Sequence, residues 1–407
     1  MSGSRRSVAL IVSLLLCACS DASAGAPSTS PTSTTMAKPA PLPPCDDLPP
    51  MEPDDPLPTN RVDDWRHIRT ITDGRPDDVA VLRDGTVWVV GLGDVLVKPY
   101  VDKDRGCLAT NDTETRGRVW RHDGGTWQLV APPRTCSDVL SEVEAAEDGS
   151  LWVFGLREVK EGEDEPCAAR WNGRGWAERT LPSEPDFALA VSDTELWTIH
   201  HRYVKDELLG QITQLVKGKA LTHKPVPNAD VLAGGPGGAV WVAGARGNYR
   251  VQVAQWDRRR WQRLPDLALP PLREYTEPWL ELDSMVATAP DDVWVVAHMT
   301  WNAEDESEPN RQILAHWNGS AWSSRVGKEI LPWGGGEIVS DGNDGFWLAD
   351  PDEGGLAHMT GWHREPVTLP TTDGHRDTNV KLSQRPGSRE VWALDEENLW
   401  STNGADE

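Results

Sequence analysis

Phenylalanine, tyrosine and basic residues are scarce in this chain. Its 407 residues include 3 Phe and 4 Tyr against 21 Trp, and 40 Lys and Arg against 64 Asp and Glu, so the formal net charge is −24 at pH 7. A strongly acidic chain repels phosphate backbones, and we therefore expect no nucleic-acid partner. The charge itself is explained most simply as a solvated surface that keeps the protein soluble.

Several motifs of known enzyme and metal-binding classes are missing. The sequence has no nucleophile elbow, no P-loop and no dinucleotide-binding fingerprint. The cysteines after residue 19 form no CxxC pair and have no histidine nearby, which argues against a zinc site. The long apolar run at the start of the chain, Val8 to Leu16, is too short to span a bilayer.

That apolar run is typical of a targeting segment. Arg5-Arg6 precedes it as a basic region, and Leu16-Cys17-Ala18-Cys19 follows it. This tetrapeptide resembles a bacterial lipobox, although Cys17 departs from the residue usual at its position. The resemblance implies a signal peptide over residues 1–18, cleavage, and palmitate and other acyl chains on Cys19. An ordinary secretory signal and a twin-arginine signal are the alternatives.

Residues 19–62 read as a disordered tether. The segment is rich in Ser, Thr, Ala and Pro, a composition that cannot bury enough apolar surface to fold. We expect it to lift the folded part off a bacterial membrane on the extracytoplasmic side. In a host with two membranes, Ser20 after the lipidated cysteine favours the outer membrane by resemblance to known sorting rules, and the cell membrane is the alternative.

A short apolar strand centred on tryptophan recurs through the rest of the chain. Successive copies of this tryptophan lie 64, 45, 44, 53, 53 and 45 residues apart, a spacing typical of propeller blades with variable loops. Each run is apolar on both faces, as expected of a strand buried between stacked blades. The seven copies contain Trp88, Trp152, Trp197, Trp241, Trp294, Trp347 and Trp392.

A hairpin follows this strand in several repeats. In His316-Trp317-Asn318-Gly319, the Asn-Gly pair predicts a two-residue type I′ turn. The tryptophans of these hairpins and of the repeated strand could stack on sugars, but their fixed phase in the repeat favours a role as the core between blades.

The N-terminal end of the repeat region supplies the strand that the last repeat lacks. The seventh repeat stops near Thr402, where a fourth strand is due, and Asp64 to Thr70 has the form of the fourth strand Gly175 to Thr180. The N-terminal strand should therefore pair in the last blade and close a ring, which also removes exposed sheet edges. The sequence predicts an all-β, seven-bladed β-propeller of four-stranded antiparallel blades over residues 63–407.

The repeats resemble a known propeller class. Asp84-Gly85-Thr86-Val87-Trp88 and Asp148-Gly149-Ser150-Leu151-Trp152 are similar to the Asp-Gly-x-x-Trp motif of two-component-regulator-type propeller repeats. The chain lacks the signature of WD repeats, so it is WD-like in architecture only. The resemblance implies a fold and carries no activity.

We expect one face of the ring to carry the binding site. The connections between second and third strands and between blades emerge on the same face, which we call the loop face, and every long insertion lies there. Aromatic anchors beside acidic runs suit a protein or glycan surface, although these rings could only pin the loops down. The candidate ligand-binding residues are Tyr203, Tyr249, Trp279, Trp301 and Trp333. The acidic runs lack the ordered ligand spacing of a calcium site.

The mouth of the channel on this face is the candidate catalytic site. Histidines and carboxylates that face each other across a channel could bind a divalent metal or perform acid–base catalysis. The seven-bladed virginiamycin B lyase has a metal site of this general kind, so a metal-dependent lyase or hydrolase is the alternative function. The candidate residues are His200, His201, His298, Asp350 and Asp395.

Four cysteines would remain after cleavage. An exported compartment permits disulfides, and their even number favours two bridges. Cys107, Cys136 and Cys167 fall in neighbouring insertions of the first two blades, so we expect one bridge within this trio and a second from Cys45 to the third thiol.

These observations together predict a membrane-anchored, extracytoplasmic binding or scaffold lipoprotein. Its partner would be a cell-envelope protein or glycan, and we expect a monomer without a cofactor. A propeller enzyme and a purely structural envelope component are the alternatives.

Overall fold

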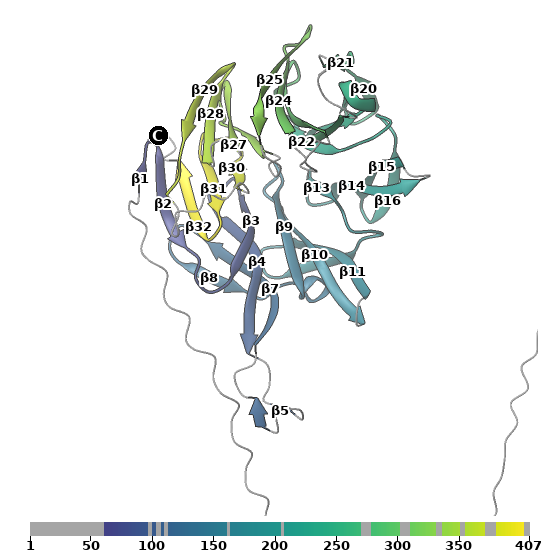
Figure 1. The fold of residues 1–407 in the computed structure, drawn as a ribbon. Coiled ribbons are helices and arrows are strands. Elements are labelled where there is room, and N and C mark those ends of the chain that lie inside the picture. The colour runs from purple at the N-terminus through teal and green to yellow at the C-terminus, as the bar shows by residue number, and fades with distance from the viewer. Residues whose placement is uncertain are drawn as a thin grey trace, which may run out of the picture.

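The computed structural model describes residues 61–96, 100–102, 107–109, 113–160, 163–204, 207–269, 278–301, 310–330, 336–350, 355–370 and 380–402. Within these ranges the protein is almost entirely β-structure. Seven antiparallel sheets form a ring, and each sheet is one blade of a β-propeller (Figure 1). The sequence-based prediction of the fold class is confirmed.

Each blade has its strands in sequence order from the channel outward, except that blade 7 takes its two outer strands from the N-terminal end of the folded region. Blade 1 contains β3 (Arg75–Val81), β4 (Val87–Leu96), β7 (Thr113–His122) and β8 (Trp127–Val130). Blade 2 contains β9 (Val139–Ala145), β10 (Leu151–Lys160), β11 (Glu163–Trp171) and β12 (Trp176–Thr180). Blade 3 contains β13 (Phe187–Ala190), β14 (Glu195–Val204), β15 (Glu207–Val216) and β16 (Lys219–His223). Blade 4 contains β17 (Val231–Gly235), β18 (Ala239–Ala245), β19 (Arg250–Trp256) and β20 (Trp261–Arg263), and β21 (Leu267–Ala268) also pairs with β19.

The remaining blades follow the same order. Blade 5 contains β22 (Trp279–Ala289), β23 (Asp292–Thr300), β24 (Asn310–Trp317) and β25 (Trp322–Ile330). Blade 6 contains β26 (Ile338–Ser340), β27 (Gly345–Asp350), β28 (Gly355–Thr360) and β29 (His363–Val367). Blade 7 contains β30 (Lys381–Gln384), β31 (Val391–Asp395), β32 (Asn398–Thr402), β2 (Trp65–Thr70) and β1 (Arg61–Val62). Outside the blades lie the hairpin of β5 (Tyr100–Asp102) with β6 (Cys107–Ala109), and the short 3-10 helices η1 (Arg134–Cys136) and η2 (Gly247–Tyr249).

The ring closes through the N-terminal strand, as the sequence predicts. β2 pairs antiparallel with β32, and Trp65 lies opposite Thr402 in this pairing. The innermost strands also form a closed circle, because each contacts the next and β30 contacts β3. Strands from the two ends of the folded region therefore share one sheet and hold the circle together (Figure 1).

The repeated tryptophans form the core between blades. Trp88, Trp152, Trp197 and Trp241 are at most 1% exposed. Because the strands that carry them have a neighbouring blade on each side, both faces are buried, which explains the apolar runs in the sequence. This burial confirms that these rings are structural.

The hairpin turn differs from the predicted one. Trp317 pairs directly with Trp322, which leaves a four-residue loop instead of a two-residue type I′ turn. The Asn318 side chain accepts hydrogen bonds from the backbone N–H groups of Ser320 and Ala321, at 3.1 and 2.9 Å. Only Gly319 takes a positive φ, of 83°. The asparagine side chain closes the turn together with a backbone hydrogen bond from Asn318 N–H to Ala321 O at 3.3 Å, so Asn318 needs no positive φ of its own.

Segments expected as loops between second and third strands are instead paired ribbons. The pairing of β10 with β11 continues to Lys160 and that of β14 with β15 to Val204. The last paired residue lies eight, eight and seven positions past the repeated tryptophan in blades 1, 2 and 3 and six past it in blade 5, but only three past it in blade 7. At about 3.4 Å per residue, the ribbons of blades 1, 2 and 3 reach roughly 14–17 Å further than that of blade 7, and the ribbon of blade 5 reaches about 10 Å further. In Figure 1, β4 and β7 run away from the ring toward β5.

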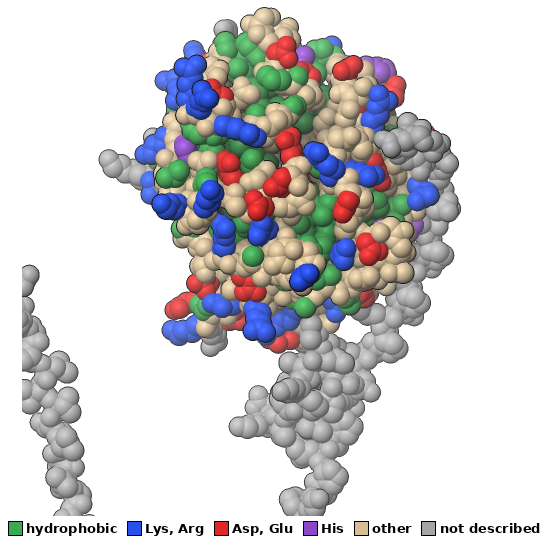
Figure 2. Space-filling model, turned by 180° about the vertical axis from the view of Figure 1, so that it is seen from behind, with side chains coloured by type: hydrophobic (Ala, Val, Ile, Leu, Met, Phe, Trp, Pro, Cys, Tyr) green, Lys and Arg blue, Asp and Glu red, His purple; other side chains and the backbone are tan. Residues whose placement is uncertain are grey.

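The surface carries charges of both signs. Figure 2 shows basic and acidic side chains interspersed over one face of the molecule. Among the residues that the structure describes, none belongs to a helix with the length and apolar character needed to cross a membrane.

Candidate functional site

His298 is held between two carboxylates of its own blade. Its Nδ1 lies 2.6 Å from Asp283 Oδ1, and its Nε2 lies 2.9 Å from Glu281 Oε2. Burial lowers the pKa of His298, but the hydrogen bonds to Asp283 and Glu281 outweigh burial and raise the pKa to about 10. The imidazole is therefore protonated at neutral pH, and in this state it has no lone pair for a metal ion or a substrate proton.

The other two candidate histidines are tied to the backbone of blades 3 and 4. His200 Nδ1 lies 2.7 Å from the carbonyl oxygen of Glu184, and its Nε2 lies 2.9 Å from Thr198 Oγ1. His201 Nε2 lies 3.0 Å from the carbonyl oxygen of Ala229. These contacts fix both rings and occupy the nitrogens that catalysis would need.

The two candidate aspartates come from the last two blades. Asp395 ends β31, and its side chain is 3% exposed. Asp350 ends β27, and the structure describes its backbone only. In the described ranges, no three His, Cys, Asp or Glu side chains are grouped so that they could hold a metal ion.

The predicted ligand-binding aromatics fall into two groups. Tyr249, in η2, packs against the core shared by blades 4 and 5, and Trp301 is 4% exposed. Trp279 is partly exposed, and its Nε1 donates a hydrogen bond to Glu281 at 3.2 Å. These three rings pin down segments of the loop face. Trp333 lies outside the described residues, and Tyr203 lies in β14 with its side chain undescribed.

A disulfide joins Cys136 of η1 to Cys167 of β11, with Cα atoms 5.7 Å apart. The bridge confirms the prediction of one disulfide within the trio of cysteines. It anchors η1 at the base of the β10–β11 ribbon, and it closes a segment with a sequence separation of 31 residues. Closing a loop of this length stabilises the fold by about 3–4 kcal/mol. Cys45 lies outside the described residues, and the structure describes the backbone of Cys107 only.

A ring of polar side chains, which we call the channel ring, lines the innermost strands. Asp78 Oδ2 accepts a hydrogen bond from the backbone N–H of Val143 at 2.8 Å, which joins blade 1 to blade 2. Equivalent bonds run from Ala188 N–H to Glu142 at 3.3 Å and from Leu382 N–H to Glu337 at 3.0 Å. These hydrogen bonds join blade 1 to blade 2, blade 2 to blade 3 and blade 6 to blade 7. The members of the channel ring are Asp78, Glu142, Ser284, Glu337 and Lys381, with Glu144 beside it.

Burial changes the pKa values of the channel-ring carboxyls. It raises the pKa of Glu142 to about 8, with a further increase from the nearby Asp78. It raises the pKa of Glu337 to about 7 although Lys381 lowers it, and that of Asp78 to about 6. Burial and the neighbouring carboxylates raise the pKa of Glu144 as well. Glu144 has no hydrogen-bond partner among the described residues, so its charge is the least compensated of the group.

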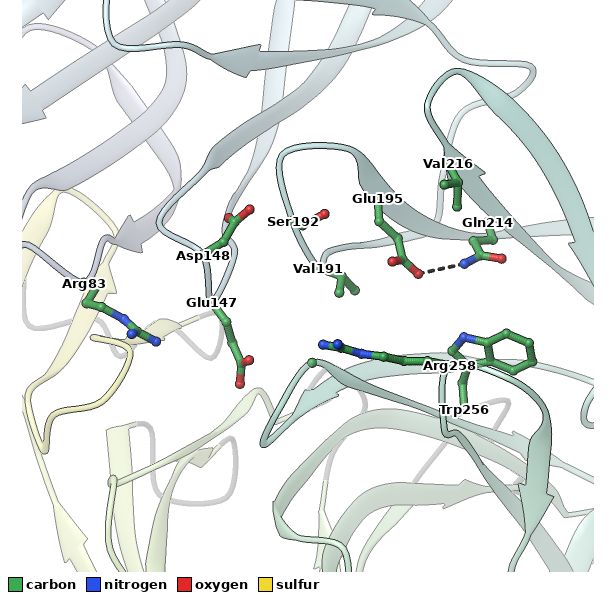
Figure 3. Close-up of a pocket in the computed structure, with 11 residues that line it drawn as sticks. Arg83, Glu147, Asp148, Val191, Ser192, Glu195, Gln214, Val216, Trp256 and Arg258 are labelled. Carbon is green, nitrogen blue, oxygen red and sulfur yellow. Dashed lines mark hydrogen bonds between the residues drawn. The ribbon is translucent and has the colours of Figure 1, made fainter.

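A polar pocket of about 490 Å³ lies on the opposite face, where the turns between first and second strands meet. We call it the turn-face pocket. Arg83 of blade 1 and Arg258 of blade 4 enter it from opposite sides, with Glu147 of blade 2 between them (Figure 3). Glu195 and Gln214 of blade 3 form another part of the wall. Four successive blades therefore contribute to a single site.

A chain of hydrogen bonds fixes the Glu195 carboxylate in this pocket. Trp261 Nε1 donates to His223 Nδ1 at 3.2 Å, and His223 Nε2 donates to Gln214 Oε1 at 3.0 Å. Gln214 Nε2 then donates to Glu195 Oε1 at 2.7 Å, which also accepts from Trp197 Nε1 at 2.9 Å. These directions require a neutral His223, and burial of that imidazole lowers its pKa.

Sequence reasoning missed both the channel ring and the turn-face pocket. A signal for the ring exists, because Asp78, Glu142, Ser284 and Glu337 each lie ten residues before a repeated tryptophan. The pocket has a weaker signal: Arg83 and Glu147 each lie five residues before a repeated tryptophan, whereas Glu195 and Arg258 occupy other positions in the repeat and meet them only through the curvature of the ring.

Comparisons with known proteins found matches among solved structures only. No family model matches the chain, and no curated protein matches it. A chain from a crystal structure of the mitotic checkpoint complex matches with a TM-score of 0.47 and 11% identity, over 88% of this chain and 100% of that one. The β-propeller domain of the trilobed protease from Pyrococcus furiosus matches with a TM-score of 0.37 and 11% identity, over 82% and 85%. An α-L-arabinanase from Penicillium chrysogenum matches with a TM-score of 0.38 and 10% identity, over 82% and 94%.

Proposed function

We propose that this protein is a binding lipoprotein of the bacterial cell envelope. A lipid on Cys19 would hold it on the extracytoplasmic side of the membrane, and its propeller would present the loop face to a protein or glycan partner. The observation that carries the proposal is the asymmetry of that face: the ribbons of blades 1, 2, 3 and 5 extend six to eight residues past the repeated tryptophan, against three or four residues in blades 4, 6 and 7.

The β10–β11 ribbon has the surface chemistry of a contact site. Val159 is 51% exposed near its end. Ion pairs of Arg157 with Glu165 and of Lys160 with Glu163 flank this side chain across the two strands. An exposed apolar residue with a charged rim is the arrangement found at protein interfaces. The disulfide at the base of the ribbon makes it rigid, which lowers the entropy cost of binding.

The disulfide also supports the proposed location. Disulfides persist in exported proteins and are rare in the cytosol. Together with the lipobox-like segment before Cys19, the Cys136–Cys167 bridge favours an extracytoplasmic, lipid-anchored protein. The repeats would be of the two-component-regulator type that their Asp-Gly-x-x-Trp motif resembles.

A metal-dependent lyase or hydrolase at the channel mouth is the alternative. It would require His298 to leave its two carboxylate partners, because in that pairing the ring is a cation. The geometry therefore supports binding better than catalysis.

The test compares two variants with matched exposure. The tagged, lipidated full-length protein is purified from its host membrane in mild detergent, and recovered partners are quantified by mass spectrometry and glycan analysis. Val159→Asp should abolish partner recovery, because it places a charge in the contact. Leu221→Asp, on the outer edge of blade 3 where Leu221 is 50% exposed, should leave recovery unchanged. Equal recovery with both variants would contradict the proposal, and recovery of no partner would favour a structural component.

A further inference from the structure

The turn-face pocket lies on the face of the ring opposite to the ribbons, so it is independent of the proposed loop-face contact. Its walls are the turns that follow the innermost strands of blades 1 to 4, together with the hairpin that joins β19 to β20. Turns of this kind in a propeller commonly do no more than reverse the chain. Here they carry charged side chains that point into a shared space (Figure 3).

Two charged groups in the pocket are without partners. Neither the Arg83 guanidinium nor the Glu147 carboxylate forms an ion pair or a side-chain hydrogen bond with any described residue. Arg83 is nevertheless held in place, because its carbonyl oxygen accepts a hydrogen bond from Arg385 of blade 7 at 3.1 Å. The fold thus fixes the backbone at Arg83, and the charges of Arg83 and Glu147 remain available to a ligand.

Arg258 is arranged in a similar way. Its Nη2 donates to the carbonyl oxygen of Gly237 at 2.7 Å, which leaves its other N–H groups facing the pocket. Gly238 provides the room for this arrangement, since a Cβ there would lie 2.4 Å from the same guanidinium nitrogen. Gly238 also has a φ of 71°, which disfavours other residues.

Glu195 supplies a preorganised acceptor. Its Oε1 already receives two N–H bonds, and its Oε2 has no partner among the described residues. Gln214, which donates one of those bonds, is only 7% exposed. Holding the carboxylate by a buried amide reduces the freedom that it would lose on binding a cation.

We propose that the turn-face pocket binds a peptide segment in which a basic residue lies between acidic residues. The basic side chain takes the carboxylates of Glu147 and Glu195, and the flanking acidic side chains take Arg83 and Arg258. The third carboxylate of the lining, Asp148, already accepts hydrogen bonds from Ser150 and from the backbone N–H of Asp193. A pocket for a small apolar molecule is lined mostly by hydrophobic side chains, whereas five of the eleven residues that line this one are charged. Alternating charge selects partners by excluding sequences of the opposite order.

The test measures fluorescence anisotropy of labelled peptides with the detergent-solubilised full chain. The probe is Gly-Asp-Gly-Lys-Gly-Asp-Gly, and the comparison is the charge-inverted Gly-Lys-Gly-Asp-Gly-Lys-Gly. The protein should bind the probe roughly tenfold more tightly than the inverted peptide, a typical effect of complementary against like charge. Arg83→Glu and Arg258→Glu should each weaken probe binding by about tenfold. Arg259→Glu is the control, because Arg259 is exposed in the same hairpin but does not line the pocket.

Three outcomes would overturn the proposal. These are equal affinity for the two peptides, an equal effect of Arg258→Glu and Arg259→Glu, and binding of free lysine as tight as that of the probe. Val159→Asp should leave probe binding unchanged, so that failure of the loop-face contact and failure of this pocket can be told apart. Urea unfolding of each variant should give the wild-type midpoint, because the substituted side chains are exposed.

Discussion

The indole of Trp65 lies edge-on against the indole of Trp347, with ring centroids 4.9 Å apart and an interplanar angle of 82°. Trp65 belongs to the N-terminal strand β2, and Trp347 belongs to blade 6. Trp197 of blade 3 contacts Trp261 of blade 4 in the same way, at 5.5 Å and 86°. The blade that closes the ring therefore packs on its neighbour through the contact used elsewhere in the propeller.

Trp65→Ala should destabilise the whole ring. The side chain is fully buried, and truncating a buried tryptophan costs about 3–5 kcal/mol through lost burial and the cavity left behind. Urea unfolding followed by tryptophan fluorescence measures the change. Arg66→Ala, at an exposed position of the same strand, should shift the midpoint little. If both variants unfold at the wild-type midpoint, the β2–β32 closure does not hold the ring together.

The channel ring predicts that stability falls as the pH rises. Glu142 and Glu337 have folded-state pKa values of about 8 and about 7, against ordinary values of 4.5. Between pH 4.5 and the folded-state pKa of each group, the folded state therefore holds more protons than the unfolded state. Stability is then fully present below pH 4.5 and is lost as the pH rises through the folded pKa values. Urea midpoints measured from pH 4.5 to 8.5 should decrease steadily.

Glu144→Gln should flatten that decrease and stabilise the protein at pH 8. The substitution removes a carboxyl group that has no hydrogen-bond partner among the described residues, and whose own pKa is raised by burial and by repulsion from Glu142, Asp78 and Glu337. Glu178→Gln, at an exposed position of the outer strand β12, is the control and should leave the pH profile unchanged. A wild-type profile for Glu144→Gln would show that the channel carboxyls are solvated as they are in the unfolded chain.

His298 should not titrate between pH 5 and 8. Its two carboxylate partners keep the imidazole protonated, with a pKa of about 10. Asp283→Asn removes one of these charges and should move the titration of His298 down into or toward this range. NMR of the imidazole Cε1–H signal follows it directly. A wild-type His298 with an ordinary titration near pH 6.5 would restore it as a candidate base or metal ligand.

Cys19→Ala should release the protein from the membrane. On the proposed function, acyl chains on this cysteine would supply about 0.8 kcal/mol for each buried methylene, which would be enough to hold the protein in the bilayer. Labelled palmitate should enter the wild-type chain but not Cys19→Ala, and fractionation should find the variant outside the membrane pellet. Cys17→Ala should be labelled normally. Palmitate labelling of both Cys19→Ala and Cys17→Ala, or of neither variant, would contradict lipidation at Cys19.

Regular features of the fold are predictable from sequence because the same residue types recur at the same position in each repeat. Trp152 and Trp241 occupy the same phase in their blades and are buried alike, and the strand around Trp65 has the form of other fourth strands. The Asn318 turn was harder to predict, since its side-chain hydrogen bonds replace the backbone geometry that Asn-Gly usually adopts.

The turn-face pocket depends on contacts that cross blades, and no single stretch of the sequence predicts those contacts. Arg83 and Arg258 are 175 residues apart in the sequence and line one pocket because the ring brings their turns together. The segment around Val159 looks like a polar loop in the sequence, since it lies beyond the apolar run of its strand. In the structure, the backbone pairing of β10 with β11 nevertheless continues through it.

Site-specific photo-crosslinking in living cells tests the loop-face contact most directly. A photoreactive amino acid replaces Val159 on the β10–β11 ribbon in one strain and Leu221 on the outer edge of blade 3 in another, since the two positions are equally exposed. We predict that ultraviolet light produces one discrete higher-mass adduct at position 159 and none at position 221. Equal adducts at both positions, or an adduct at position 221 alone, would contradict the assignment of the ribbon as the surface that meets a partner.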